Sequence, residues 1–213
     1  PVAGLDRVGS LLKVIGRVIP MSKEPLDIEG TFINSTGKFI VKGQVEVATA
    51  KGRLESLRLH PENPAAHEVA LAAITDADWI VMGPGSWFSS VLPHLLVPKQ
   101  REAIVKSNAK KLLILNLDSA NVTGRNFEPG EYAGYTPLEH IKILQEYAPG
   151  LKFDYLIADS SLDIRVGEAE ENLSSTGGEL VVADLRDNAT QIHHSSNKLT
   201  PLLAHIASKT LIG

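Results

Sequence analysis

The pattern of apolar and polar residues divides this chain near residue 60. Residues 1–16 carry apolar side chains at helical spacing and predict an amphipathic helix, followed by a short strand at 17–20 that Pro20 ends. Short apolar segments separated by turn residues then predict strands at the positions 26–33, 38–48 and 53–59. This first part therefore reads as a small β-ribbon subdomain over residues 26–59, with turns at 34–37 and 49–52.

After residue 60 the pattern alternates between helices and strands. The predicted helices are 65–73, 91–96, 98–108, one that opens at Thr136, and 198–208. The predicted strands are 79–82, 111–117, 153–158 and 180–183. Such alternation is typical of a doubly wound, mostly parallel sheet. We therefore expect one Rossmann-like, three-layer α/β/α domain over residues 1–213, with the ribbon inserted in it.

Composition narrows the class of protein. The 213 residues are 43% hydrophobic and 22% charged, as in ordinary globular proteins, and the formal net charge of −4 offers no basic excess for nucleic acid. The absence of cysteine excludes disulfides, thiolate catalysis and cysteine-ligated metals. No apolar run approaches the roughly 20 residues of a membrane span, and no signal peptide is visible, so we expect a cytoplasmic location.

A glycine-rich turn, Gly83-Pro84-Gly85-Ser86, follows the predicted strand 79–82 and precedes a helix. Ligands of open α/β sheets bind at such turns, beyond the carboxyl ends of the strands. Ser86 can cap the helix, whose first N–H groups can bind phosphate. The spacing fits neither a Walker A loop nor a dinucleotide fingerprint, and a tight connection without a ligand explains the glycines equally well.

Other polar residues lie where strands or loops end. Asn116 and Asp118 end the strongest strand, where they can contact a ligand or a cation, or merely cap the turn. Tyr132 and Tyr135 precede a helix, where an aromatic ring can stack on a base or anchor the loop.

The remaining polar residues predict little chemistry. His193 and His194 are adjacent, so on a strand they point to opposite faces, and we predict no metal site. The serines near the turn, Ser86, Ser89 and Ser90, have no base at a recognisable spacing. We therefore predict no catalytic residue and expect hydrogen bonding to a ligand. Four aspartates near late strand ends have no partner that spacing identifies: Asp159, Asp163, Asp184 and Asp187.

The segment 76–97, with the residues DADWIVMGPGSWFSSVLPHLLV, resembles the signature of the CofD-like superfamily and is closest to the YvcK-type gluconeogenesis factors. Similar supporting segments cover nearly the whole chain: 26–29, 41–45, 113–117 and 130–140. The resemblance implies a Rossmann-like fold with a nucleotide-binding cleft. YvcK-type members are cytoplasmic, bind UDP-sugars such as UDP-N-acetylglucosamine, and support growth and cell shape on gluconeogenic carbon.

The resemblance also implies two alternatives to such a non-enzymatic regulator. Members of the CofD branch are transferases that use Mg²⁺ to move a phospholactyl group onto a deazaflavin in making coenzyme F420. The other alternative is an interaction module whose cleft is vestigial. The deazaflavin pocket that would distinguish the transferase is not identifiable from the residues.

By resemblance, the ligand-binding residues are the turn, the Asn that ends the next strand, the aromatic before the helix, and one residue of the segment 192–196. They are Gly83, Pro84, Gly85, Ser86, Asn116, Tyr135 and His193. At His193 the family carries an Arg, whose bidentate phosphate contacts a His does not reproduce. The family's glycine-rich first segment is not in this chain, so we expect half of the cleft from other residues. The sheet edge exposed without it favours a homo-oligomer.

Overall fold

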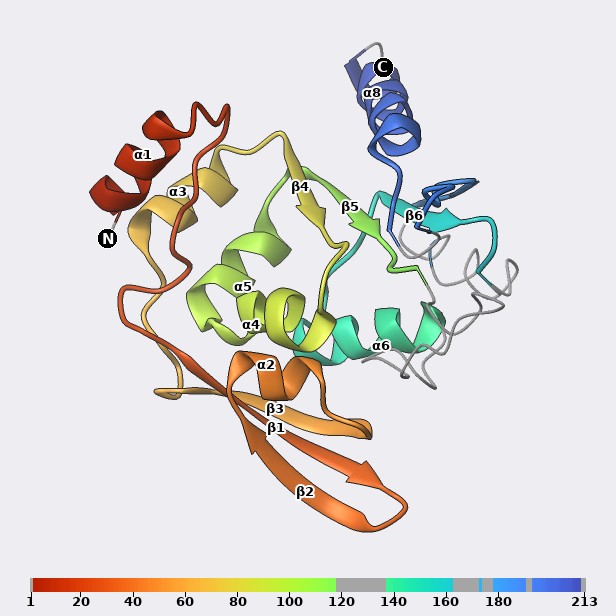
Figure 1. The fold of residues 1–213 in the computed structure, drawn as a ribbon. Helices are drawn as coiled ribbons and strands as arrows, with labels where there is room; N and C mark the ends of the chain where they lie inside the picture. Colours follow the sequence, from red (N-terminus) through yellow and green to blue (C-terminus); the bar gives the residue numbers. More distant parts are fainter. Residues whose placement is uncertain (1, 118–136, 163–172, 174–177, 191–192, 212–213) are drawn as a thin grey trace. The chain divides into compact units, whose positions relative to one another are not determined.

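A computed structural model describes residues 2–117, 137–162, 173, 178–190 and 193–211. The chain forms two compact units, which we treat separately. Unit 1 comprises Pro1–Ile80, Ser86–Lys110 and Leu144–Leu151, and unit 2 comprises Val81–Gly85, Lys111–Ile143 and Lys152–Gly213. Figure 1 gives the labels of the helices and strands.

Unit 1 contains an antiparallel sheet of three strands in the order β2-β1-β3 (Figure 1). The strands are β1 (Asp27–Asn34), β2 (Gly37–Lys42) and β3 (Arg53–His60). The side chain of Asn34 accepts a hydrogen bond from the Thr36 N–H at 2.9 Å, which closes the β1–β2 turn. The predicted β-ribbon and its first turn are thus confirmed.

Two predicted strand segments of unit 1 are wrong. Gln44–Ala48 forms a short helix, α2, and the segment 17–20 has no strand. Gly43, with φ of +107°, turns the chain away from β2, and β3 pairs with the other edge of β1 instead. The alternation of exposed Val45 and buried Val47 suits a strand as well as a single helical turn, so periodicity does not decide between them.

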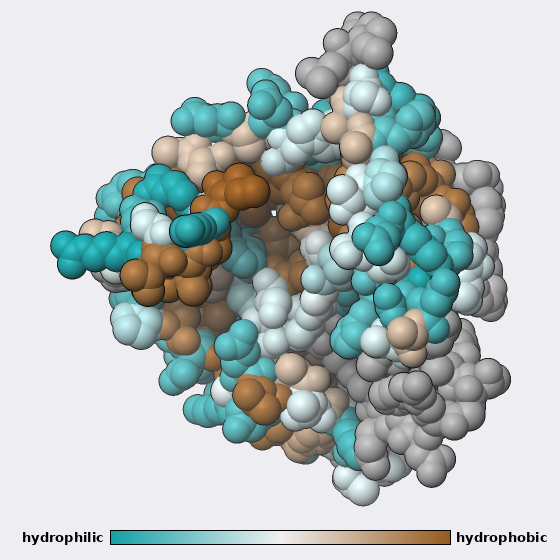
Figure 2. All heavy atoms as spheres, turned by 45° about the horizontal axis from the view of Figure 1, so that its top comes forward, coloured by the Kyte–Doolittle hydropathy of each residue, from teal (hydrophilic) through white to brown (hydrophobic). Residues whose placement is uncertain are grey.

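Two helices of unit 1 expose different kinds of side chain: apolar ones at the first helix and charged ones at the other. The helix α1 (Val2–Leu11) has no buried residue, and the apolar side chains of Leu11, Leu12 and Ile15 are exposed. Figure 2 shows one face of the molecule, on which hydrophobic residues (brown) reach the surface between hydrophilic ones (teal). On α5 (Pro98–Lys106), hydrogen bonds from Lys106 and Lys99 lower the pKa of Glu102 to about 2.

The segment after the glycine-rich turn packs into the core of unit 1. It forms a π-helical turn, η1 (Trp87–Val91), followed by α4 (Leu92–Leu96). Trp87, Phe88 and Leu92 are almost fully buried, and the ring of Phe88 lies edge-on to that of Phe32 on β1, 5.9 Å between centroids. These contacts attach the segment to the ribbon. The remaining helix, α3 (Glu68–Thr75), begins after His67, whose ring accepts a hydrogen bond from the Val69 N–H.

The second sheet has the order β4-β5-β6-β7. Its strands are β4 (Trp79–Met82), β5 (Lys110–Ile114), β6 (Tyr155–Asp159) and β7 (Glu179–Ala183). Parallel pairing joins β5 to β6 and β6 to β7, and the apolar side chains of β5 and β6 are buried as the continuous apolar runs predict. The predicted α/β fold is therefore confirmed.

Two further helices complete the description: α6 (Pro137–Tyr147) and α8 (Ser196–Leu211). The last one begins two residues earlier than predicted and includes Pro201. Across the part of the chain that the structure describes, no helix is both long and apolar enough to cross a bilayer.

Candidate functional site

The glycine-rich turn and Asn116 come together in unit 2. The Gly85 N–H donates to Asn116 Oδ1 at 2.8 Å, and Asn116 Nδ2 donates to the Gly85 carbonyl at 2.5 Å. Gly85 follows β4 and Asn116 follows β5, so both lie at carboxyl ends of strands. The side-chain amide of Asn116 therefore binds both the N–H and the carbonyl group of Gly85.

The two glycines of the turn have different roles. Gly83 has φ of +69°, and a Cβ there would lie 2.5 Å from the carbonyl oxygen of Ile114. Gly85 has φ of +157°, and a Cβ there would meet nothing within 4 Å. Gly83 is thus required for close packing of the turn against β5, whereas Gly85 borders open space that a ligand can enter.

Ser86 caps the segment that follows the turn, as predicted. Its Oγ accepts hydrogen bonds from the Ser89 N–H at 3.1 Å and from the Ser89 hydroxyl at 2.6 Å. The helix that it opens is the five-residue π turn η1 rather than a regular α-helix. The Ser86 oxygen therefore acts as a local acceptor within unit 1.

A buried ion pair at the carboxyl end of β6 was not predicted. The carboxylate of Asp159, only 1% exposed, accepts hydrogen bonds from the N–H groups of Leu185 at 2.7 Å and Ser161 at 2.9 Å. The Ser161 hydroxyl also donates to it, and Arg186 Nε lies 3.3 Å away.

The sequence contains Asp159 as a polar strand end, but no spacing rule points to Arg186 as its partner. Burial alone would raise the pKa of Asp159, yet the bonds from Ser161 and Leu185 and the charge of Arg186 lower it. Asp159 is therefore a carboxylate at neutral pH.

The adjacent histidines differ in exposure. His193 has an exposed side chain, and its carbonyl accepts a hydrogen bond from the Asp187 N–H at 2.9 Å. His194 is half-buried and forms an isolated antiparallel bridge with Arg186. Burial lowers the pKa of His194, while the charge of Asp159 and a bond to the Leu115 carbonyl oppose this effect. His194 thus lies at Leu115, the residue that directly follows β5.

Three residues that the sequence suggests as ligand contacts lie outside the described residues: Asp118, Tyr132 and Tyr135. Within the described ranges, no three His, Asp or Glu side chains are grouped so as to hold a metal ion.

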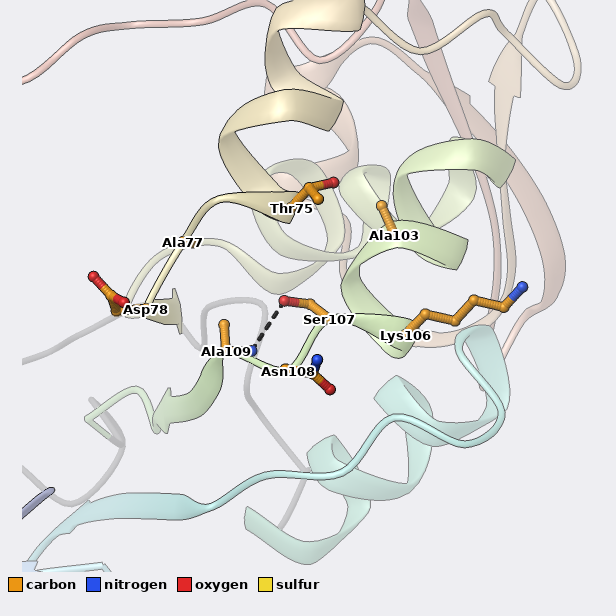
Figure 3. Close-up of a pocket in the computed structure, with 8 residues that line it drawn as sticks. All are labelled: Thr75, Ala77, Asp78, Ala103, Lys106, Ser107, Asn108 and Ala109. Atoms are coloured by element: carbon orange, nitrogen blue, oxygen red, sulfur yellow. Dashed lines mark hydrogen bonds between the residues drawn. The ribbon is translucent and has the colours of Figure 1, made fainter. Parts of the chain in front are cut away.

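A hollow of about 410 Å³ lies in unit 1, where α3 and α5 end and β4 and β5 begin. Its polar side chains do not converge: Asp78 and Lys106 point away from each other in Figure 3. Lys106 is paired with Glu102 at 2.9 Å, and Ser107 accepts from the Ala109 N–H at 3.1 Å. Ligand sites have convergent polar groups, so this hollow is a weaker candidate than the turn.

Comparison with known proteins supports the predicted resemblance. The family model for the 2-phospho-L-lactate transferase CofD matches residues 2–200. A gluconeogenesis-factor-type protein of Mycobacterium tuberculosis is 35% identical over 216 residues, which cover 98% of this chain and 60% of that protein. The gluconeogenesis factor of Halalkalibacterium halodurans is 34% identical over 155 residues, or 72% of this chain and 45% of its own length.

A solved structure agrees. The crystal structure of a UPF0052 family member from Bacillus halodurans has a TM-score of 0.75 and 26% identity, covering 95% of this chain and 66% of that chain. The chain thus spans about three fifths of the length of the M. tuberculosis relative.

Proposed function

We propose that this chain, which belongs to the family of the 2-phospho-L-lactate transferase CofD, binds a nucleotide sugar. Gluconeogenesis factors are among the relatives of this chain. The ligand is of the UDP-N-acetylglucosamine type. The protein acts as a cytoplasmic, non-enzymatic regulator that supports growth and cell shape on gluconeogenic carbon sources.

The observation that carries this proposal is the geometry of Gly85 and Asn116. Two hydrogen bonds from one side chain hold the Gly85 backbone before any ligand arrives, which lowers the cost of ordering the loop on binding. The open space where a Cβ would stand lets a phosphate group approach the backbone closely. The turn lies beyond the carboxyl ends of β4 and β5, the usual ligand position in open α/β sheets.

The other residues have supporting roles in this proposal. Pro84 and Ser86 shape the turn around the phosphates, and Tyr135 stacks on the base. His193, whose side chain is exposed, contributes a hydrogen-bonding group to the ligand in this proposal.

Isothermal titration with UDP-N-acetylglucosamine tests the proposal. We expect saturable binding by the purified protein and an affinity about tenfold lower for Asn116→Ala, since two hydrogen bonds to Gly85 are lost. The exposed Asn108 borders the other hollow, so Asn108→Ala is the matched control. The absence of heat at millimolar ligand, or equal affinities of the two variants, would contradict the proposal.

A transferase activity is the second candidate, because the matching family model describes a phospholactate transferase. The assay supplies a guanylylated phospholactate donor, a deazaflavin and Mg²⁺, and follows the phospholactyl product by chromatography. Product that depends on the protein would establish the transferase. Binding of UDP-N-acetylglucosamine without such product would favour the regulator.

A further inference from the structure

A second hollow in unit 1 has the features of a ligand pocket. It encloses about 310 Å³ between the ribbon and the segment η1–α4, within the size range of small-molecule sites. Asp27 and Gln44 come from the ribbon side, and Ser90 and His94 come from η1 and α4. Apolar side chains that include Leu59 and Pro93 form the rest of its wall.

Three polar side chains that line this pocket are not paired with one another. Asp27, Gln44 and Ser90 make no side-chain hydrogen bond or ion pair with any residue in the described part of the chain. All three side chains are exposed, so their polar groups are free to bind a ligand. This contrasts with the hollow of Figure 3, where Lys106 and Ser107 are paired within the protein.

His94 is oriented by a buried amide. Gln100, 3% exposed on α5, places its Nε2 at 2.6 Å from His94 Nδ1. With the amide nitrogen of Gln100 facing Nδ1, this ring nitrogen is the acceptor and the ring proton is assigned to Nε2. Burial lowers the pKa of His94, which keeps the ring neutral. His94 therefore offers the pocket a neutral N–H donor.

We propose that this pocket binds an uncharged, hydroxyl-bearing small molecule of about monosaccharide size. Hydroxyl groups both donate and accept, which matches the His94 donor, the Asp27 carboxylate and the two-way groups of Gln44 and Ser90. The apolar wall packs against the carbon skeleton. None of the residues that line this pocket belongs to the turn Gly83–Ser86 that carries the proposed nucleotide-sugar function.

The charges of the pocket select against other ligands. No Lys or Arg lines it, so a phosphate group would face the Asp27 carboxylate without a compensating cation. An amine would gain little from Asp27, because an exposed carboxylate forms only weak ion pairs. The neutral polar groups therefore decide the class of ligand.

Nuclear magnetic resonance of the ¹⁵N-labelled protein tests the site with three probes: glucose, glucose 6-phosphate and ethanolamine. We expect glucose to shift the backbone amide signals of Ser89 and Ser90 saturably, with a dissociation constant in the millimolar range. Glucose 6-phosphate has the same skeleton with an added dianion, and we expect it to bind at least tenfold more weakly.

Two substitutions at exposed positions of the pocket wall remove polar groups without changing the core. Ser90→Leu and Gln44→Leu should each weaken glucose binding about tenfold through lost hydrogen bonds and lost space. Ser35→Leu, in the exposed β1–β2 turn, is the matched control and should bind as the unmodified protein does.

Three results would overturn the proposal: no saturable shift with glucose up to about 10 mM, equal affinity in Ser90→Leu and Ser35→Leu, or tighter binding of glucose 6-phosphate or ethanolamine than of glucose. Titration with UDP-N-acetylglucosamine in the same samples, followed at the Gly85 amide signal, reports on the turn, because Gly85 does not line the pocket.

Discussion

Replacing Asp159 by Asn removes the charge from the buried ion pair at the end of β6. The carboxylate accepts bonds from Leu185 N–H, Ser161 N–H and the Ser161 hydroxyl, and it faces Arg186 at 3.3 Å. An Asn side chain keeps one oxygen acceptor and turns an NH₂ group toward the remaining donors. The substitution thus leaves a buried donor unsatisfied and removes the negative charge that faces Arg186.

We expect Asp159→Asn to lower the free energy of unfolding by about 3–5 kcal/mol, the range for breaking one side of a buried pair. The matched control is Asp184→Asn. Asp184 pairs with Lys198 at 2.8 Å, but its side chain is 69% exposed, so its loss should cost less than about 1 kcal/mol. Lys198 also keeps its bond to the Arg186 carbonyl.

Urea unfolding followed by circular dichroism measures the difference between the two variants. Amide hydrogen exchange at Leu156 and Ile157 on β6 reports on unit 2 itself, where the lost contacts lie. Equal destabilisation by the two substitutions, or unchanged exchange at β6, would refute the assignment of Asp159 as a stabilising buried carboxylate.

The same prediction has a pH dependence. The pKa of Asp159 lies below the ordinary 3.8 in the folded protein, so the unfolded chain binds this proton more readily. The stabilisation is therefore complete above the ordinary value and is lost as the pH falls through the folded value. The stability gap between the unmodified protein and Asp159→Asn should shrink below about pH 4.

Other predictions follow from the same contacts. Gly83→Ala should destabilise unit 2 by at least about 2 kcal/mol more than Gly85→Ala in urea unfolding, because only the first places a Cβ against Ile114; similar costs would contradict this. Asn116→Ala should cost about 1–3 kcal/mol in the same assay, and an unchanged midpoint would show that its bonds to Gly85 do not contribute. Carboxyl carbon NMR should give Glu102 a pKa of about 2 that rises in concentrated salt; a salt-independent value would exclude its lysine pairs as the cause.

Local patterns made parts of this fold predictable. The strand β4 (Trp79–Met82) has the predicted bounds, and the turn at 34–37 closes the β1–β2 hairpin through the side chain of Asn34. The cap by Ser86 is equally local, since its partner Ser89 is three residues away. Each depends on residues that are neighbours in sequence, where periodicity and turn chemistry act.

Contacts between residues that are distant in the sequence could not be predicted from local patterns. β2 leaves β1 near the start of that strand, where Gly43 has φ of +107°, and Gln44–Ala48 is a helix; the alternation within residues 44–48 does not reveal this. Arg186 lies 27 residues from Asp159, and no local pattern links them.

The sequence alone therefore determined the α/β class, the ribbon, the turn and the resemblance to the CofD-like superfamily, because these reside in periodicity and in one contiguous signature. Only the tertiary structure decided that Asn116 holds Gly85 across 31 residues, and that His194 rather than His193 is half-buried. The structure alone also shows the pocket around His94. These features arise from parallel strands and packed helices that bring distant residues together, and hydrogen bonds and burial act only once the chain has folded.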